Sequence, residues 1–354
     1  MIIAGGGTGG HLFPGLAVAE ALAAGEGAEV LFIGSASGLE ARVVPQTRFP
    51  FYPLAIQGLR GRGARGALTF AWQLPRALLQ SWYRIGSLRP ALVIGLGGYG
   101  SVPVVLAAWL RRVPSVLLEQ NARPGFANRL LAHVARRVCA TFVESIPYFP
   151  SGKAVQTGNP VRSLSSSLEP QPGYFTIFVF GGSQGARTIN SAAVEAATIV
   201  GERLTGLRII HQTGQPDVEW VQRQYAERGV VAEVLAFIED MASAYARADL
   251  VVCRAGASTL AELTTLGKPS ILIPYPFAAD DHQRANAEVL VHRGAAEMIL
   301  NAELTPERLA NSILALAGDP ARRAAMGKAA QQLARPDATL RVVEVCRQVA
   351  GERG

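Results

Sequence analysis

Cysteine and charge are scarce in this 354-residue sequence. Its three cysteines, Cys139, Cys253 and Cys346, lie far apart with no CxxC pair, so they predict no disulfide framework and no cysteine metal site. This pattern is typical of a protein in a reducing compartment. Charged residues make up only 17% of the sequence and hydrophobic residues 49%, which excludes a largely disordered chain.

The sequence also lacks a signal peptide and an uninterrupted membrane span. Met1-Ile2-Ile3 has no basic region followed by a long apolar run, so no secretory leader is expected. Residues 91–110 carry no charge and approach the length of a membrane span, but Pro103 and four glycines interrupt them. We therefore predict a strand at 91–96, a glycine loop and a helix at 103–110 instead of a transmembrane helix.

The charge that is present is mainly positive, with a formal net charge of +7. Such a balance favours an acidic partner, which includes nucleic acid, nucleotide phosphates and an anionic membrane surface. No recognised nucleic-acid-binding motif accompanies the charge, so we expect no nucleic-acid partner.

Two glycine-rich turns organise the chain. Residues 1–22 contain a short apolar stub, the turn Gly5-Gly6-Gly7-Thr8-Gly9-Gly10, and an apolar stretch with helical spacing. The same order of strand, glycine turn and helix recurs at 175–180, 181–186 and 189–200. It brings backbone N–H groups and a helix N-terminus to one point, where an anion can bind. A chain of this length with two such openings predicts two α/β halves.

The first turn formally matches the dinucleotide fingerprint Gly-x-Gly-x-x-Gly at Gly5, Gly7 and Gly10. That fingerprint expects an acidic residue at the end of the second strand, where it binds a ribose. Here Ile33 is followed by Gly34-Ser35-Ala36-Ser37. The missing acid argues against a nicotinamide-dependent enzyme.

Strands and helices alternate through both halves, which predicts a parallel sheet in each. A turn-rich segment at 155–162 predicts the hinge between them. In the second half we expect a strand at 234–238 and one helix over 306–333. A last helix at 338–349 follows Pro336.

Glu119-Gln120-Asn121 follows a predicted strand at 115–118. Ligands of parallel α/β sheets bind at the carboxyl ends of strands, so Glu119 is a candidate general base or hydroxyl-binding group. A helix cap or a solvated polar cluster is the alternative interpretation.

Residues 53–88 combine a basic loop with large aromatic side chains. Arg60, Arg62 and Arg65 precede a segment rich in aromatic and leucine residues, including Phe70, Trp72, Trp82 and Tyr83. This combination suits a membrane interface, where rings lie at headgroup level and arginines meet anionic lipid. A core-facing amphipathic helix beside an exposed loop explains it equally well.

Taken together, the motifs of the chain resemble the MurG family of glycosyltransferases. The resemblance covers nearly the whole sequence and rests on seven segments in the family order: 6–11, 97–99, 119–121, 158–162, 181–186, 254–262 and 281–286. Two positions depart from the family pattern. Leu118 stands where the family usually has histidine, and Gly100 where it usually has valine.

The resemblance implies an α/β protein with two Rossmann-like domains facing across a cleft, the GT-B fold. The first domain would span residues 1–158, face the membrane and the acceptor, and be joined by the C-terminal helix 337–354. The second would span 159–336 and bind UDP-N-acetylglucosamine (UDP-GlcNAc).

The resemblance also implies the reaction. The enzyme would be an inverting hexosyltransferase of peptidoglycan biosynthesis, moving N-acetylglucosamine (GlcNAc) to the N-acetylmuramic acid (MurNAc) C4 hydroxyl of undecaprenyl-pyrophosphoryl-MurNAc-pentapeptide, so that lipid I becomes lipid II. Asp280 and Asp281 are adjacent and form no Asp-x-Asp metal motif, so no metal and no cofactor is expected. The alternatives are another GT-B enzyme, such as a glycolipid synthase or a UDP-GlcNAc 2-epimerase, and a non-catalytic nucleotide-sugar-binding scaffold at the membrane.

By the same resemblance, each part of the site maps onto numbered residues. His11 and Glu119 are the rival catalytic bases, and the residues alone do not rank them. The residues implied to bind the acceptor pyrophosphate are Gly7, Gly97, Gly98 and Tyr99. The residues implied to bind the donor are Thr8, Gly9, Gly10, Asn121, Arg162, Ser183, Gln184, Ile238, Ala257, Ser258, Thr259, Leu260, Ala261, Glu262, Gln283 and Asn286.

The expected partners are UDP-GlcNAc, lipid I, the anionic inner-leaflet surface, and other proteins of cell-wall synthesis and cell division. The expected location is the cytoplasmic face of the plasma (inner) membrane, to which the protein would bind peripherally.

Overall fold

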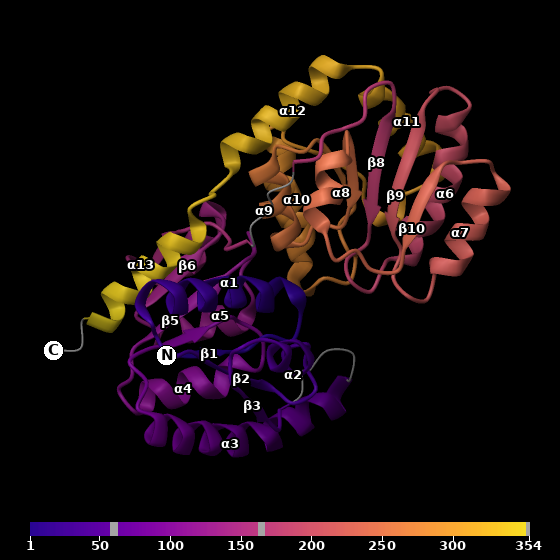
Figure 1. The fold of residues 1–354 in the computed structure, drawn as a ribbon. Coiled ribbons are helices and arrows are strands. Elements are labelled where there is room, and N and C mark those ends of the chain that lie inside the picture. The colour runs from indigo at the N-terminus through magenta and orange to yellow at the C-terminus, as the bar shows by residue number, and fades with distance from the viewer. Residues whose placement is uncertain (57–62, 162–166, 352–354) are drawn as a thin grey trace. The chain divides into compact units, whose positions relative to one another are not determined.

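The computed structural model describes residues 1–56, 63–161 and 167–351, without side chains for residues 26 and 63–71. Its packing divides the chain into two compact units (Figure 1). Unit 1 contains residues 1–162 and 335–354, and unit 2 contains residues 163–334. The junctions expected from the sequence, at 158/159 and 336/337, lie a few residues from these boundaries.

Unit 1 is built on a parallel sheet of seven strands in the order β3-β2-β1-β4-β5-β6-β7. The strands are β1 (Ile2–Ala4), β2 (Leu31–Ser35), β3 (Phe51–Leu54), β4 (Val93–Gly95), β5 (Ser115–Glu119), β6 (Arg137–Ala140) and β7 (Ala154–Gln156). Because side chains alternate along a strand, Ile2 and Ala4 enter one core while Ile3 enters another on the opposite face.

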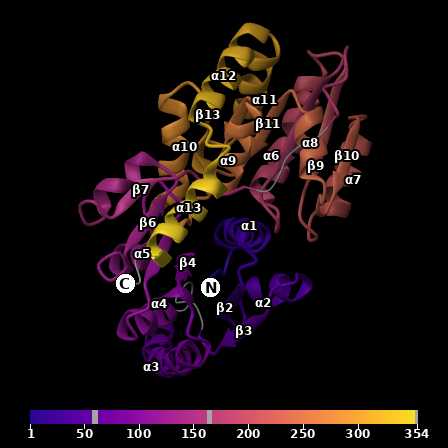
Figure 2. The same cartoon turned by 60° about the vertical axis from the view of Figure 1, so that its left-hand side comes forward.

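Helices cover both faces of this sheet, as Figure 2 shows. They are α1 (Gly9–Glu26), α2 (Glu40–Val43), α3 (Gly63–Leu88), α4 (Ser101–Leu110), α5 (Phe126–Leu131) and α13 (Ala338–Gly351). α1 and α13 share one core, and α3 and α4 share the other. The last helix thus returns to unit 1, and Val342 and Cys346 pack with Leu12 and Leu22 of α1.

Unit 2 repeats the architecture with six parallel strands in the order β10-β9-β8-β11-β12-β13. The strands are β8 (Phe175–Phe180), β9 (Leu207–Gln212), β10 (Ala232–Leu235), β11 (Leu250–Cys253), β12 (Ser270–Leu272) and β13 (Glu297–Met298). The helices are α6 (Arg187–Gly201), α7 (Val218–Glu227), α8 (Met241–Arg247), α9 (Ala257–Leu266), α10 (His282–His292), α11 (Pro306–Ala317) and α12 (Pro320–Leu333).

The structure confirms the expected strand, glycine turn and helix at both openings. It also confirms that the apolar stretch 91–110 forms a strand, a loop and a helix, which are β4 and α4 with the turn between them. Two predicted elements are wrong. The single helix expected over 306–333 is two helices, because Pro320 cannot continue α11 and Asp319 caps α12 by accepting from the Arg322 N–H at 2.9 Å. The strand expected at 234–238 ends at Leu235, so Ile238 lies in the following loop.

A buried histidine lies at the centre of a polar network in unit 2. Burial lowers the pKa of His211 from 6.5 to about 3, and Asp217 opposes this more weakly. His211 Nδ1 lies 2.9 Å from Tyr225 Oη, and Nε2 lies 3.1 Å from Asn190 Oδ1. Because the Asn190 amide nitrogen donates to Asp217, its oxygen must accept, so Nε2 carries the proton of a neutral ring.

We expect the stability of unit 2 to fall in acid because His211 must stay neutral. Between pH 6.5 and about 3 the unfolded chain binds a proton that the folded ring does not, so the free energy of unfolding falls by about 1.4 kcal/mol per pH unit. Trp220 is the only tryptophan in residues 163–334, so its fluorescence reports urea unfolding when the others are phenylalanine. His211→Gln should weaken the pH dependence; an unchanged slope between pH 7 and pH 5 would contradict it.

Candidate active site

The predicted glycine motifs lie where the strand order of each sheet reverses. In unit 1 the chain moves from β1 to β2 and β3, then returns to β4 on the other side of β1. In unit 2 it moves from β8 to β9 and β10, then returns to β11 beside β8. Ligands of parallel α/β sheets bind outside the strand carboxyl ends at such points. Each unit therefore offers a candidate binding position between the turns that follow its two central strands.

In unit 1 the two glycine turns contact each other through their main chains. A Cβ on Gly5 would lie 2.6 Å from the Gly97 carbonyl oxygen, and one on Gly98 would lie 3.3 Å from the Gly6 carbonyl oxygen. Gly5 and Gly97 also adopt φ of 106° and 89°, which a side chain disfavours. The structure thus brings together the first glycine turn, which contains Gly7, and the turn at 97–99, the two segments whose residues the resemblance gives to the acceptor pyrophosphate.

One N–H group of the first turn is already used inside the protein. The Gly7 N–H donates to Glu40 Oε2 at 2.6 Å, and the Ser35 N–H donates to Glu40 Oε1 at 2.8 Å. Glu40 is 1% exposed. The expected contact of Gly7 with a ligand phosphate cannot use this N–H. No sequence pattern marks Glu40, because it begins α2 at no fixed spacing from the fingerprint.

His11 lies in the first turns of α1, which Thr8 precedes without a side-chain cap. Its Nδ1 is 2.7 Å from Gln120 Oε1, while Gln120 Nε2 donates to the Leu96 carbonyl at 3.3 Å. Since the Gln120 oxygen accepts, Nδ1 carries the proton and Nε2 holds the lone pair of the neutral ring. Gln120, which is 2% exposed, therefore orients His11.

Glu119 has a different environment. It is buried at the end of β5, and four donors surround its carboxylate. Oε1 accepts from the Asn121 N–H at 2.9 Å and from Asn121 Nδ2 at 3.2 Å. Oε2 accepts from the Gly125 N–H at 3.1 Å and from Asn128 Nδ2 at 3.0 Å. Burial raises the pKa of Glu119, and these hydrogen bonds oppose the rise. The geometry suits a carboxylate that organises the segment 120–128, which is the loop after β5 and the first turn of α5.

In unit 2 two helices begin without a side-chain cap. α6 begins after Ala186, and α9 begins after Gly256, neither of which has a side-chain oxygen. The first N–H groups of each helix therefore have no acceptor within the helix, and an anion can take that place. Ser183 and Gln184 are exposed in the turn before α6. Ser258 Oγ, in the first turn of α9, is buried without a hydrogen-bond partner among the described residues.

Gln212 at the end of β9 joins two parts of the predicted donor site. Its Nε2 donates to the Gly182 carbonyl at 3.0 Å, and its Oε1 accepts from the Ile238 N–H at 2.8 Å. Ile238 is one of the expected donor residues, and of its main-chain groups only the carbonyl remains for a ligand. Gln212 is 3% exposed and had not been selected from the sequence.

The remaining donor residues differ in what they can offer. Glu262 Oε2 accepts from Tyr245 Oη at 2.9 Å, and Gln283 Oε1 accepts from the Tyr275 N–H at 2.9 Å, which leaves the Gln283 amide nitrogen for a ligand. Leu260 is buried, and its N–H donates to the Gly256 carbonyl at 3.0 Å. Asn286 is fully buried beside the Ala255 carbonyl. Leu260 and Asn286 thus shape the turn from within.

The other predicted residues are distributed between the units. In unit 1, Thr8, Gly9 and Gly10 open α1, Tyr99 belongs to the second glycine turn, and Asn121 follows β5. In unit 2, Ala257, Thr259 and Ala261 lie in the first turns of α9. Arg162 lies outside the described residues.

Arg254, the first residue of the motif at 254–262, is a buried cation. Its guanidinium follows β11 and donates to the Ile273 and Pro274 carbonyls at 3.1 and 3.0 Å, to Asn301 Oδ1 at 2.9 Å and to Thr188 Oγ1 at 3.1 Å. Burial lowers its pKa to about 10. It fixes the start of α6 relative to the loop after β12.

No group of three or more His, Cys, Asp or Glu side chains in the described part of the chain is arranged to hold a metal ion.

The sequence matches two domains of one family in order: the glycosyltransferase family 28 N-terminal domain over residues 1–140 and its C-terminal domain over residues 176–342. A Myxococcus xanthus protein is 47% identical over 98% of this chain and 92% of its own, and one from Geobacter sulfurreducens is 49% identical over 97% of both. Both are named UDP-N-acetylglucosamine–N-acetylmuramyl-(pentapeptide) pyrophosphoryl-undecaprenol N-acetylglucosamine transferase.

Among solved structures, Acinetobacter baumannii MurG matches with a TM-score of 0.81 and 35% identity over 98% of both chains. A putative UDP-N-acetylglucosamine 2-epimerase from Listeria monocytogenes, at 14% identity and a TM-score of 0.71, shares the fold alone. The two Rossmann-like units therefore form a GT-B protein, and the chain belongs to the MurG family within glycosyltransferase family 28.

Proposed function

We propose that this protein transfers GlcNAc from UDP-GlcNAc to the MurNAc C4 hydroxyl of undecaprenyl-pyrophosphoryl-MurNAc-pentapeptide, which completes lipid II for peptidoglycan. The observation that carries the proposal is the match over nearly the full length to relatives named for this transfer. The two separate anion-binding positions support it, since donor and acceptor each bring a diphosphate.

His11 is the base in this proposal. As the acceptor hydroxyl oxygen forms its bond to C1 of the sugar, Nε2 of His11 takes the hydroxyl proton, and UDP leaves with the electron pair of the broken C1–O bond. Gln120 holds the ring in the tautomer that this step requires. Glu119 is assigned the positioning of Asn121 and the segment 120–128, because each of its oxygens already accepts two hydrogen bonds.

The donor binds mainly to unit 2 in this proposal. Its diphosphate binds at the uncapped starts of α6 and α9, beside Ser183 and residues 257–259. The negative charge that develops on the departing diphosphate is therefore stabilised by main-chain N–H groups. Uracil donates a hydrogen bond to the Ile238 carbonyl, a ribose hydroxyl donates to Glu262, and the transferred sugar contacts the Gln283 side chain. By resemblance, Arg162 and the unit 1 residues Thr8 and Asn121 complete the set. Gly9 and Gly10, which the resemblance gives to the donor, are assigned here to the acceptor pyrophosphate.

The acceptor pyrophosphate is assigned to the second glycine turn, Gly97-Gly98-Tyr99, and to the start of α1. The N–H groups of Gly9 and Gly10 belong to the first turn of an 18-residue helix, where no intrahelical acceptor exists.

Transfer of radiolabelled GlcNAc from UDP-GlcNAc to a short-chain lipid I analogue, with EDTA present, tests the reaction directly. We expect transfer that depends on the acceptor and persists in EDTA. Tight binding of UDP-GlcNAc without transfer would support the proposed donor site and contradict the proposal that lipid I is the acceptor. Loss of transfer in EDTA would refute the metal-independent route.

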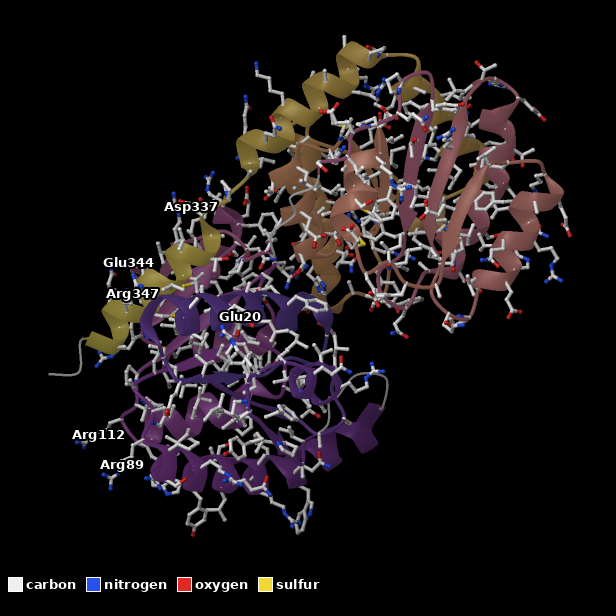
Figure 3. All side chains as sticks on the ribbon, in the orientation of Figure 1. Glu20, Arg89, Arg112, Asp337, Glu344 and Arg347 are labelled. Carbon is white, nitrogen blue, oxygen red and sulfur yellow. The ribbon has the colours of Figure 1, made fainter. Side chains whose placement is uncertain are left out.

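We further propose that an exposed apolar stripe on unit 1 binds the cytoplasmic face of the inner membrane. Trp72, Leu79 and Tyr83 lie at helical spacing on α3 and are 84%, 54% and 67% exposed. Trp109 and Leu110 at the end of α4 are about half exposed. Arg89 and Arg112 follow the two helices and project outward (Figure 3). Apolar side chains beside arginines suit an anionic lipid surface. No helix in the described ranges is long and apolar enough to cross a bilayer.

The structure corrects one member of the patch predicted from the sequence. Trp82 packs against the core, with the Arg111 guanidinium 4.2 Å from its ring, so it does not face outward. Arg60 and Arg62 lie outside the described residues, and the side chains of Arg65 and Phe70 are not described.

Replacing Trp72, Leu79 and Tyr83 with serine should release the protein from anionic vesicles, because each replacement removes an exposed apolar side chain worth about 1.5–3 kcal/mol when buried. Vesicle co-sedimentation measures the loss. A matched triple, Val143→Ser, Tyr148→Ser and Leu340→Ser, removes exposed apolar groups from other elements and should still bind. Equal sedimentation of both triples would contradict the assignment.

A further inference from the structure

A buried carboxylate occupies the inside of the first glycine turn. Glu40 begins α2, just beyond the end of β2, and it accepts from the Gly7 and Ser35 N–H groups at 2.6 and 2.8 Å. It is 1% exposed, and none of the ion pairs among the side chains that the structure describes includes it. Two main-chain N–H groups from two different turns therefore stabilise this charge.

Three glycines make the space that this carboxylate fills. A Cβ on Gly6, Gly34 or Gly38 would lie 2.7, 2.7 or 2.3 Å from an atom of the Glu40 side chain. Distances this short exclude any side chain at these positions unless Glu40 moves. The two turns after β1 and β2 are thus built around the carboxylate.

In related α/β folds the turn after the first strand binds a ligand phosphate with its N–H groups and the helix that follows. We propose that Glu40 is an internal substitute for that phosphate and a positioning residue of the acceptor side. Its carboxylate holds the first glycine turn closed, sets the start of α1 from which His11 projects, and keeps a nucleotide phosphate out of unit 1.

This assignment explains why a chain with two strand–glycine–helix openings needs only one nucleotide site. The negative charge of Glu40 repels a phosphate at Gly7 and occupies the N–H that would bind it. A phosphate in unit 1 must therefore lie toward the N–H groups of Gly9 and Gly10 and the second glycine turn. The assignment of Glu40 to the acceptor side rests on the proposed transfer reaction.

Glu40→Ala tests the assignment, because it removes the carboxylate and leaves two N–H groups facing a cavity. We expect kcat/KM for the lipid I analogue to fall about 10- to 100-fold, since the start of α1 is no longer fixed. The Kd for UDP-GlcNAc, set mainly by unit 2, should stay at the wild-type value. Glu20→Ala is the matched control: Glu20, labelled in Figure 3, is exposed on α1 and pairs with Arg48.

Acetate separates the anion role from a packing role. Because acetate fits the vacated place, it should raise the Tm of Glu40→Ala and restore part of its transfer, whereas chloride at equal ionic strength should not. The wild type and Glu20→Ala should not respond. Wild-type activity in Glu40→Ala, or a Tm that acetate leaves unchanged, would overturn the proposal.

Glu40→Gln keeps the shape of the side chain if the alanine variant fails to fold. Its amide offers one acceptor and turns an NH2 group toward the other N–H, so acceptor kcat/KM should fall while the Kd for UDP-GlcNAc holds. Equal wild-type and glutamine values would overturn the assignment. If the wild type does not transfer to lipid I, the proposed function fails, and stabilisation of Glu40→Ala by acetate still decides whether Glu40 fills an anion site.

Discussion

Replacing His11 with alanine should lower kcat about 100- to 10,000-fold and leave the Kd for UDP-GlcNAc unchanged. The loss follows from removing the group that takes the acceptor hydroxyl proton. The wild-type rate should fall in acid as the ring is protonated, because a protonated base cannot accept. Single-turnover transfer measured across a range of pH reports both effects. The fall in rate at low pH, the acid limb of the profile, should be absent in His11→Ala. His133→Ala removes an exposed histidine of unit 1 and should behave as wild type.

Glu119→Gln distinguishes the two candidate bases. It exchanges a carboxylate with four donors for an amide whose NH2 group opposes some of them, so we expect weaker acceptor binding and a less stable segment at 120–128. Its acid limb should persist, because His11 still titrates. If the acid limb of the rate profile were lost in Glu119→Gln and kept in His11→Ala, Glu119 would be the base instead of His11.

The local pattern of the sequence was sufficient for most of the fold. Apolar runs, glycine turns and helical spacing predict the openings at β1–α1 and β8–α6, because backbone conformation there depends on neighbouring residues. The break between α11 and α12 was missed although Pro320 and its cap Asp319 are visible in the sequence. The helical spacing of apolar residues on both sides of Pro320 favoured one continuous helix over 306–333, and the proline was not taken as a break.

The site was harder to predict, because its geometry depends on contacts between distant segments. Gly-Gly-His and Glu-Gln-Asn indicated His11 and Glu119 as rival bases, but only the structure shows Gln120 bound to His11, 109 positions away. Glu40 and Gln212 carry no motif that sets them apart from any other glutamate or glutamine. Their roles come from buried hydrogen bonds to the main chain of other turns. Sequence motifs select candidates for ligand binding, whereas the residues that hold the turns carry no comparable signal.

Gly185→Ala should abolish donor binding, with the affinity for UDP lower by about 100-fold or more and unit 2 destabilised by about 4 kcal/mol or more. A Cβ on Gly185 would lie 1.8 Å from the Thr213 carbonyl oxygen, and φ at this residue is +73°. In return, a Cβ on Gly214 would lie 2.3 Å from the Gln184 carbonyl oxygen. The turns after β8 and β9 therefore touch main chain to main chain, and neither can move aside alone. Calorimetric titration with UDP and urea unfolding measure the two losses.

Gly229→Ala supplies the control for backbone strain, because Gly229 has φ of +65° and no atom within 4 Å of an added Cβ. It should cost about 1–2 kcal/mol and leave UDP binding unchanged. The difference between the variants then measures the contact between the turns. Gln212 ends β9 directly before the second of these turns and binds the turn after β8 by donating to the Gly182 carbonyl, while it accepts from the Ile238 N–H. Separating the turns should thus disturb the phosphate and base contacts together, so Gly185→Ala should weaken uridine as well as UDP. Unchanged uridine affinity would show that the two contacts are independent.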